Sequence, residues 1–260
     1  MTTSTVPAEL RLAARTAVVT GSTSGIGAAI ARALAAEGSF VLVSGRDAAR
    51  GRDVADGIQA AGGRAVFVPS DLAGSYADLR AFAAAATGAL GGRVDILVNN
   101  AGIYPATLTP DLADADLDAM LAVNVRAPHV LAAELAPAMA SRGSGVIVNI
   151  GSWMARIGSP YAALYTATKA AAEQLTRAWA AEFGPRGVRV NTVAPGATLT
   201  PGNEAAKDIL EQLTAGTPAG HPVRPEDVAD AVVFVASGAA SMMHGAIIDV
   251  DGGISAARMS

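Results

Sequence analysis

The sequence predicts an α/β protein built on one parallel sheet with helices on both faces. Short apolar runs rich in Val and Ile alternate with longer Ala-rich stretches along nearly the whole chain. Apolar runs of about four to eight residues between turn signals are typical of buried strands, and the longer stretches are typical of helices. Strands that alternate with helices form parallel sheets. We therefore expect a single doubly wound domain.

Seven apolar runs are the predicted strands, at Thr16–Thr20, Phe40–Ser44, Ala65–Pro69, Asp95–Asn99, Gly145–Ile150, Val188–Val193 and Ala246–Val250. The predicted helices cover about Ala28–Glu37, Ala48–Ala60, Ala77–Thr87, Asp114–Ser141, a segment ending at Phe183, and Pro225–Ser237. We expect the helix at Asp114–Ser141 to bend, because Pro128 and Pro137 remove backbone donors from its interior. No repeat or linker divides residues 1–260, so we predict one domain, with residues 1–14 as a loose leader and residues 197–222 as a Pro- and Gly-rich lid.

The composition excludes several functional classes. The net charge is −4 without a basic block, so nucleic acid is not an expected partner. The chain has no cysteine, and its three histidines lie far apart, so neither a disulfide nor a metal site is expected. No apolar run is long enough to span a bilayer, and the first residues lack a signal-peptide pattern. We expect a soluble cytoplasmic protein that does not bind membranes.

A glycine-rich segment, Gly21–Gly27, lies between the first predicted strand and the first predicted helix. Its spacing is G-x-x-x-G-x-G. Glycines allow a tight turn and close approach of the backbone to a pyrophosphate, and a helix N-terminus offers free N–H groups and a positive dipole end. A flexible turn would account for the glycines alone, but their position between strand and helix favours a nucleotide site.

The end of the second predicted strand indicates which dinucleotide is bound. An acidic residue there would bind the free 2′-hydroxyl of the adenosine ribose, whereas an arginine suits a 2′-phosphate. Gly45 stands where the acid would be needed, and Arg46 follows it. We predict NADP(H) as the more favoured cofactor, with NAD(H) possible. Asp47 could reach the ribose instead, although it is more simply the N-cap of the next helix.

Tyr165 and Lys169 form the candidate proton-transfer pair. Four residues are about one helical turn, so both side chains project from one face of a helix. A nearby ammonium favours the phenolate and is expected to bring the pKa of the phenol down from about 10. Ser152, just after an apolar run, could hold a carbonyl or alcohol oxygen beside them. The chain has only two lysines, which makes a lysine at this position more informative.

Together these motifs resemble those of the short-chain dehydrogenase/reductase family, from about Thr16 to Gly253. The matching residues are T-G-S-T-S-G-I-G at Thr20–Gly27, Asp71-Leu72, N-N-A-G at Asn99–Gly102, Asn124, Ser152, Tyr165 with Lys169, and P-G-x-x-x-T at Pro195–Thr200. Ser152 and Tyr165 are 13 positions apart, the interval usual in that family. The resemblance implies a seven-stranded Rossmann-type sheet and an NAD(P)-dependent oxidoreductase.

The resemblance also implies a role for each matched residue. Tyr165 would be the general acid/base, Ser152 would orient the substrate oxygen, and Lys169 would bind the nicotinamide ribose and lower the pKa of Tyr165. Asn124 would hold a water that links Lys169 to solvent. The residues that would line the cofactor cleft are Gly21, Ser22, Thr23, Ser24, Gly25, Ile26, Gly27, Asp71, Leu72, Asn99, Ala101, Gly102, Pro195, Gly196, Thr198 and Thr200. Asn124 could instead hydrogen-bond backbone groups within a helix. Asp71 could cap a helix, and Asn99 could be a turn residue.

We expect reversible hydride transfer between the dinucleotide and a mostly apolar ketone or secondary alcohol, without a metal. The candidate pocket walls are apolar and aromatic, with Arg156 as the nearest charge: Ile103, Tyr104, Trp153, Met154, Tyr161 and Leu164. One alternative is a 3-oxoacyl-carrier-protein reductase, although no basic docking face is evident. Another is a non-catalytic NADP(H)-sensing module, which would not need the Ser152, Tyr165 and Lys169 group.

The helix that carries Tyr165 also suggests an assembly. It has small residues at Ala163, Ala167, Ala170 and Ala171, together with Trp179, and small residues permit close helix–helix approach. Members of the family that the chain resembles pair this helix across a dimer axis. We expect a homotetramer first and a homodimer second.

Overall fold

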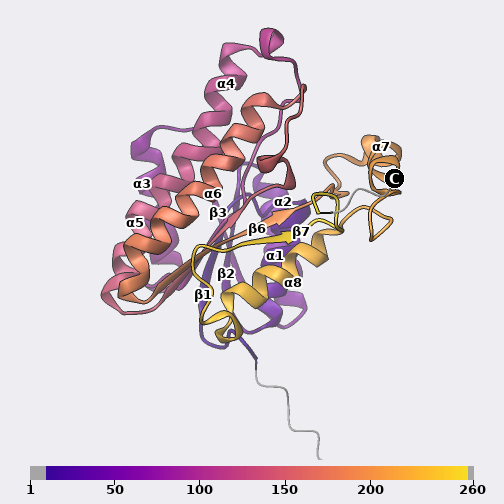
Figure 1. Cartoon of the computed structure of the whole chain (residues 1–260). Helices are drawn as coiled ribbons and strands as arrows, with labels where there is room; N and C mark the ends of the chain where they lie inside the picture. The colour runs from indigo at the N-terminus through magenta and orange to yellow at the C-terminus, as the bar shows by residue number, and fades with distance from the viewer. Residues whose placement is uncertain (1–9, 257–260) are drawn as a thin grey trace, which may run out of the picture.

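The computed structural model describes residues 10–256, which contain one seven-stranded sheet in the order β3-β2-β1-β4-β5-β6-β7 (Figure 1). Every neighbouring pair of strands is parallel. The predicted fold class is confirmed. The strands are β1 Thr16–Val19, β2 Phe40–Gly45, β3 Arg64–Pro69, β4 Ile96–Asn99, β5 Gly145–Ile150, β6 Val188–Pro195 and β7 Ile247–Val250.

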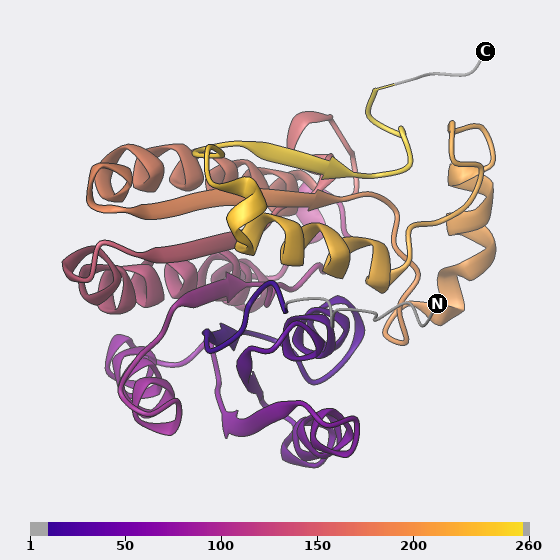
Figure 2. The same ribbon diagram turned by 90° about the horizontal axis from the view of Figure 1, so that it is seen from below.

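The strand order reverses between β1 and β4. From β1 the chain proceeds to β2 and β3 on one side, and from β4 it proceeds to β5, β6 and β7 on the other. Figure 2 shows this progression from the indigo strands to the yellow edge strand β7. The loops that leave β1 and β4 diverge at this point, and they open a crevice at the carboxyl ends of the strands. Doubly wound sheets bind ligands in this crevice.

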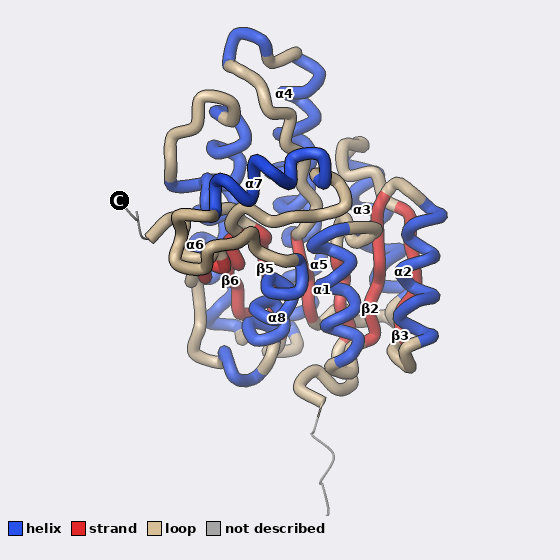
Figure 3. Tube along the Cα trace, turned by 90° about the vertical axis from the view of Figure 1, so that its right-hand side faces the viewer, coloured by secondary structure: helices blue, strands red, loops and turns tan. Residues whose placement is uncertain are grey.

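Two layers of helices enclose the sheet. One face is covered by α1 (Gly25–Ala36), α2 (Ala48–Ala60) and α8 (Pro225–Ala236), which lie in front of the strands in Figure 3. The other face is covered by α3 (Tyr76–Ala89), α5 (Ala127–Ser141) and α6 (Ala163–Phe183). The strands therefore lie between two apolar layers, which explains why their sequences are apolar on both faces.

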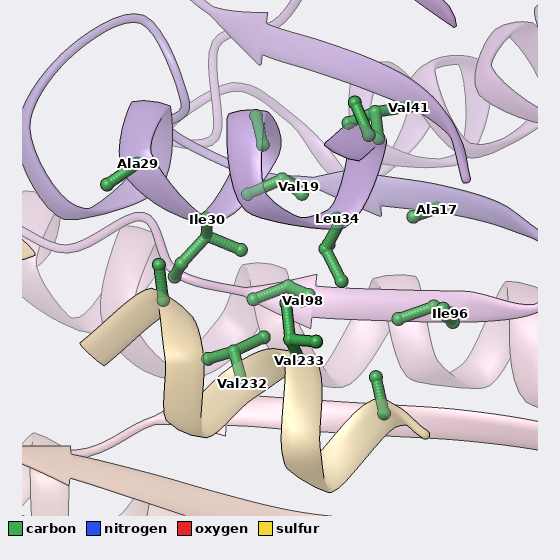
Figure 4. Close-up of a cluster of buried hydrophobic side chains, with 14 of the residues drawn as sticks. Ala17, Val19, Ala29, Ile30, Leu34, Val41, Ile96, Val98, Val232 and Val233 are labelled. Atoms are coloured by element: carbon green, nitrogen blue, oxygen red, sulfur yellow. The ribbon is translucent and has the colours of Figure 1, made fainter. Parts of the chain in front are cut away.

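The core beside the crevice is formed where α1 and α8 pack over the central strands. Ile30 and Leu34 of α1 face Val232 and Val233 of α8, with Val98 of β4 beneath them (Figure 4). All five side chains are at most 1% exposed. Burying such a side chain stabilises the fold by about 1.5–3 kcal/mol. The cluster therefore fixes the position of α1 relative to β1 and β4.

The structure departs from the sequence prediction in its helices. The stretch Asp114–Ser141, predicted as one helix, consists of three consecutive elements: α4 (Asp114–Leu121), a π-helical turn (Ala122–Arg126) and α5. The break precedes Pro128, which lies in the first turn of α5, so proline does not bend a helix interior there. Helix α1 begins at Gly25, three residues before the predicted start, and the predicted lid contains an additional helix, α7 (Lys207–Thr214).

The predicted leader also needs correction. Residues 1–9 lie outside the described part of the chain. Within residues 10–14, Leu12 is 2% exposed and its backbone N–H donates to the Glu37 carbonyl at 2.9 Å. Arg11 forms an ion pair with Glu37. These contacts fix the segment against the end of α1, because Leu12 buries apolar area that a loose leader would leave in water.

Candidate active site

The crevice at the carboxyl edge is a cleft of about 790 Å³. Its walls come from the segments that follow β1, β2, β3 and β4, together with Ala119 of α4, Val123 of the π-helical turn and Thr200 after β6. This volume is within the range of small-molecule sites, about 300–1,000 Å³. The lining includes twelve predicted cofactor-binding residues, Gly21, Thr23, Ser24, Gly25, Ile26, Gly27, Arg46, Asp71, Leu72, Ala101, Gly102 and Thr200.

The start of α1 suits an anion. Its N-cap, Ser24, makes no side-chain capping bond, and the first turn contains no acidic residue. The first N–H groups of the helix therefore remain available to a pyrophosphate. Gly27 has no room for a side chain, because a Cβ there would lie 2.4 Å from both Asn100 Nδ2 and the Gly21 carbonyl oxygen. This close packing lets the loop turn tightly over β1, and the residues present fit a dinucleotide pyrophosphate.

Asn100 holds the glycine loop in place, a role that the sequence did not reveal. Its side-chain Nδ2 donates to the carbonyl oxygens of Thr20 at 2.8 Å and Gly21 at 3.1 Å. In return Thr20 Oγ1 accepts from the backbone N–H groups of Asn100 and Ala101, at 3.0 and 3.1 Å. The ends of β1 and β4 are thus joined beneath the cleft.

The side chains of two predicted cofactor residues, Ser22 and Asn99, make structural hydrogen bonds. Ser22 is completely buried, where its Oγ donates to the Val19 carbonyl at 2.7 Å and accepts from Ser44 N at 2.9 Å. Asn99 is 5% exposed and donates to Asn149 Oδ1 at 2.8 Å. Both side chains tie strands together below the cleft floor. Neither residue lines the cleft, so their contact with the cofactor stays a prediction.

The ribose end of the cleft is lined by Gly45, Arg46, Asp47 and Arg50. Asp47 is the N-cap of α2, accepting from Arg50 N at 3.0 Å, and its other oxygen pairs with Arg50 Nε at 2.7 Å. Arg46 is exposed and makes no ion pair within residues 10–256. A Cβ at Gly45 would lie 2.7 Å from the Thr23 methyl group, so packing against Thr23 leaves no room there for an acidic side chain.

The proton-transfer group is assembled from β5 and α6. Ser152 follows β5, is 6% exposed, and its Oγ accepts from Met154 N at 3.2 Å. Tyr165 and Lys169 lie one turn apart on α6, with Lys169 Nζ 5.8 Å from the centre of the Tyr165 ring. Lys169 is 6% exposed and donates to the Ile150 carbonyl at 2.8 Å. The structure thus brings together all three residues that the sequence predicted.

The predicted effect of Lys169 on Tyr165 is not what the structure shows. Burial raises the pKa of Tyr165 above its ordinary value, while hydrogen bonding with Ser152 lowers it in part and Tyr104 raises it. Burial also lowers the pKa of Lys169 to about 8. The ammonium bonds the Ile150 carbonyl and lies beside the ring, so loss of solvation dominates the pKa of the phenol.

Asn124 lies on the π-helical turn between α4 and α5 and is 4% exposed. Its Nδ2 donates to the Ile103 carbonyl and to Thr168 Oγ1, each at 3.1 Å, and its Oδ1 accepts from Ile103 N at 2.9 Å. The side chain is therefore fully engaged in holding the loop after β4. Single π turns occur frequently at functional sites.

Gly102 connects the two halves of the site. It lines the cleft, and a Cβ on it would lie 3.4 Å from Lys169 Nζ and 3.6 Å from Asn124 Oδ1. Gly102 thus stands between the cleft and the Lys169 ammonium, which itself lines a smaller neighbouring cavity. A dinucleotide whose pyrophosphate lies at α1 would extend toward Tyr165.

The segment after β6 is only partly placed as predicted. Thr200 lines the cleft opposite Gly25. Thr198 is 8% exposed and bonds the Gly196 carbonyl, and Gly196 packs against the backbone of Asp251. Pro195 ends β6 and is buried. Asn203, which the sequence analysis missed, holds the turn by donating to the Thr198 carbonyl at 2.9 Å and accepting from Thr200 N at 2.7 Å.

Three other features considered in the sequence can be compared with the structure. In residues 10–256 no group of three His, Cys, Asp or Glu side chains is arranged to hold a metal ion. Over the same residues, no helix combines the length and apolar character needed to cross a bilayer. Trp179 is 4% exposed and packs in the core with residues of α5, so it is not part of the exposed surface of α6.

The doubly wound sheet, the glycine loop at α1 and the Ser152, Tyr165 and Lys169 group define a dinucleotide-dependent oxidoreductase. Comparison with known proteins gives the family. The family model described as enoyl-(acyl carrier protein) reductase matches residues 21–255. A solved structure of a short-chain dehydrogenase/reductase family protein is 46% identical, with a TM-score of 0.85, over 95% of this chain and 100% of that one. The chain belongs to the short-chain dehydrogenase/reductase family.

Two further relatives illustrate the activities found among similar proteins. Cis-4-hydroxycyclohexanecarboxylate dehydrogenase from Sinomonas cyclohexanicum is 41% identical over 94% of this chain and 98% of its own length. A solved structure from Beutenbergia cavernae, assigned as an NAD(P)-dependent gluconate 5-dehydrogenase with NADP bound at low occupancy, is 41% identical with a TM-score of 0.90, covering 96% of this chain and 100% of that one. The protein is thus an NAD(P)-dependent oxidoreductase of alcohol and carbonyl groups.

Proposed function

We propose that the protein interconverts mostly apolar ketones and secondary alcohols, with NADP(H) favoured over NAD(H). The observation that supports this most strongly is the position of Gly102, which lies both in the dinucleotide cleft and against Lys169 and Asn124. This adjacency supports a nicotinamide bound with its reactive edge turned toward the proton-transfer group. The cytoplasm, where reduced nicotinamide dinucleotides are maintained, is the proposed location.

The dinucleotide supplies or accepts the hydride when it is bound. The chain's own residues would manage the proton. Ser152 donates a hydrogen bond to the carbonyl oxygen, and Tyr165 transfers its phenolic proton to the same oxygen as negative charge develops. Because burial raises the pKa of Tyr165, the phenol keeps its proton at neutral pH and is suited to act as the acid in ketone reduction. Lys169 binds the ribose hydroxyls, and Asn124 fixes the loop that carries Gly102 and Ile103.

The wall beyond the reacting group favours a neutral substrate. Tyr104 and Tyr161 are 47% and 58% exposed there and offer aromatic surface. Lys169 is buried beside Tyr165, and the next positive charge along the candidate wall is Arg156. Arg156 is already committed to Asp249, through Nη1 at 3.0 Å and a second close contact, and to Glu173 at 3.5 Å. A carboxylate substrate would therefore have to compete with two carboxylates for this arginine.

A substrate panel tests the proposed function. Cyclohexanone, acetophenone, gluconate, cis-4-hydroxycyclohexanecarboxylate and a 3-oxoacyl thioester should be compared with each nicotinamide cofactor. We expect the largest kcat/KM with neutral ketones and NADPH. The 3-oxoacyl-carrier-protein reductase alternative, favoured by the acyl-carrier description of the matching family model, predicts the thioester instead. A non-catalytic NADP(H) sensor would bind cofactor and turn over nothing.

Replacing Arg46 with serine should weaken NADPH binding by about tenfold or more and leave NADH binding nearly unchanged. A hydrogen bond to a charged group contributes about 1.5–3 kcal/mol, and 1.4 kcal/mol is about tenfold in affinity. Only the cofactor that carries a 2′-phosphate offers that partner. Dissociation constants from cofactor fluorescence measure both effects.

Arg52 provides a matched control, because it is an exposed arginine on α2, the helix that follows Arg46, but it lines a separate groove. Arg52→Ser should leave both dissociation constants unchanged. If the wild-type protein bound NADH at least as tightly as NADPH, the proposed preference would be wrong.

We also propose a homotetramer, or failing that a homodimer, paired through α6. Ala163, Ala167 and Ala170 are exposed on that helix, and small side chains allow close approach of a second helix. Light scattering at micromolar concentration should give a mass of four or two chains. Replacing Ala167 with arginine should lower that mass, and a monomeric wild-type protein would refute the proposal.

The segment 197–222 is proposed to close over the substrate. Its helix α7 lies beyond the carboxyl ends of β6 and β7 (Figures 1 and 2). Ile209 and Leu213 on α7 are 67% and 46% exposed. On closure, these two side chains could contact an apolar substrate in the pocket. Loops that close over a bound substrate exclude water from the reaction in other enzymes.

A further inference from the structure

Tyr104 lies directly against the catalytic tyrosine. The centres of the Tyr104 and Tyr165 rings are 4.6 Å apart, with the ring planes tilted by 43°. Carbon atoms in contact lie about 3.5–4.0 Å apart, so a substrate layer between the rings would need a separation of about 7–8 Å. No substrate group fits between them. Any substrate that reaches the Tyr165 hydroxyl must therefore approach from outside the gap between the two rings.

The backbone on both sides of Tyr104 is anchored. On one side, Asn124 bonds both the N–H and the carbonyl of Ile103, at 2.9 and 3.1 Å. On the other side, Thr107 N donates to the Tyr161 carbonyl at 3.0 Å, which joins this loop to the loop that precedes α6. Pro105 follows Tyr104 and restricts its backbone to extended conformations. The ring is therefore held over Tyr165 by its surroundings, although 47% of the residue is exposed.

We propose that Tyr104 determines the substrate size limit of this site, by covering one side of Tyr165 so that only a ketone with at least one small flank can place its oxygen between Tyr165 and Ser152. The inference rests on the proposed ketone reductase function. It assigns to Tyr104 a role in specificity, whereas proton transfer belongs to Tyr165. Aromatic pairs at this separation are favourable beyond their buried area, which stabilises the covering position.

A pair of ketones that differ in one flank tests the proposal. Acetophenone has one methyl flank, and benzophenone has two phenyl flanks. The wild-type protein should prefer acetophenone. Tyr104→Ala should raise the ratio of kcat/KM for benzophenone to that for acetophenone by at least about tenfold, the scale on which pocket volume discriminates apolar groups. Tyr104→Phe keeps the ring and should keep the wild-type ratio. An unchanged ratio in Tyr104→Ala, or an equal change in Tyr104→Phe, would overturn the proposal.

A second measurement needs no substrate. The groups that face Tyr165 are Ser152, Tyr104 and, from its own helix, Lys169. Tyr104→Ala should open one side of the Tyr165 phenol to water, so Tyr165 should ionise at lower pH than in the wild type. The titration of Tyr165 is isolated by subtracting the ultraviolet titration of the same protein carrying Tyr165→Phe. Tyr76, 54% exposed on α3, supplies the control, since Tyr76→Ala should not shift this titration. An unshifted titration in Tyr104→Ala would show that the ring does not cover Tyr165.

The two measurements separate the inference from the function on which it rests. A wild-type protein that reduces no ketone with either cofactor would contradict the proposed function. The titration would then still decide whether Tyr104 covers the phenol.

Discussion

Replacing Tyr165 with phenylalanine should lower kcat for ketone reduction by about 10³- to 10⁴-fold, the scale of a lost general acid. Cofactor affinity should stay within about threefold, a change worth less than 1 kcal/mol. The ring that packs against Tyr104 is retained, so only the proton donor is removed. Single-turnover measurements with NADPH and a ketone give the rate, and fluorescence titration gives the affinity.

The matched control for this substitution is Tyr76→Phe, which removes an exposed phenolic hydroxyl on α3, outside the dinucleotide cleft. It should leave kcat within about twofold. Turnover that persists in Tyr165→Phe at more than about a tenth of the wild-type rate would mean that another group, or water, supplies the proton.

Replacing Lys169 with methionine should reduce both turnover and cofactor affinity, each by about tenfold or more. The side chain is buried and lies where the cleft meets Gly102, so it can bond the nicotinamide ribose and is not replaced there by water. Methionine fills a similar volume with an unbranched chain, which limits collapse of the site. Lys169→Ala should show the same direction with a larger loss of stability, because it leaves a cavity.

The pKa of Lys169 adds a pH dependence to this prediction. Burial lowers that pKa to about 8 in the cofactor-free protein, so the group is an ammonium below pH 8 and a neutral amine above it. NADPH affinity should therefore decrease as the pH rises through about 8, and this decrease should be absent in Lys169→Met. The only other lysine, Lys207 on α7, pairs with Glu211, and Lys207→Met should retain the wild-type pH dependence. A pH-independent affinity in the wild type would contradict this role.

The sequence was sufficient to predict the sheet, since all seven strands lie within two residues of their predicted bounds. Apolar runs between turn signals identify buried parallel strands because both faces must be apolar. The predicted starts of α2, α4 and α8 are met, and that of α3 is one residue away, but the start of α1 was not predicted. Helix α1 begins at Gly25, inside the glycine loop. Glycine has a low intrinsic helix propensity, so the sequence did not indicate this start, although tertiary packing and the Ser24 N-cap permit it.

The residues of the site could be predicted from the sequence, but their burial, pKa shifts and side-chain contacts could not. Ser152, Tyr165 and Lys169 do come together, yet the sequence carries no measure of burial, and burial raises the pKa of Tyr165 against the expected direction. Ser22 and Asn99 match the family motif, but their side chains bond β1, β2 and β5 in the interior. The π-helical turn at Asn124 and the Tyr104 packing depend on contacts between distant segments, which no local pattern indicates.

The most direct test of the central claim is the transfer of deuterium from NADPH labelled at nicotinamide C4. The protein should be incubated with a neutral ketone and each of the two C4-deuterated epimers, and the alcohol product analysed by mass spectrometry and NMR. The proposed function predicts that one epimer, and not the other, places a single deuterium on the carbinol carbon, and that Tyr165→Phe nearly abolishes the product. An alcohol that carries no deuterium from either epimer would contradict hydride transfer at this site.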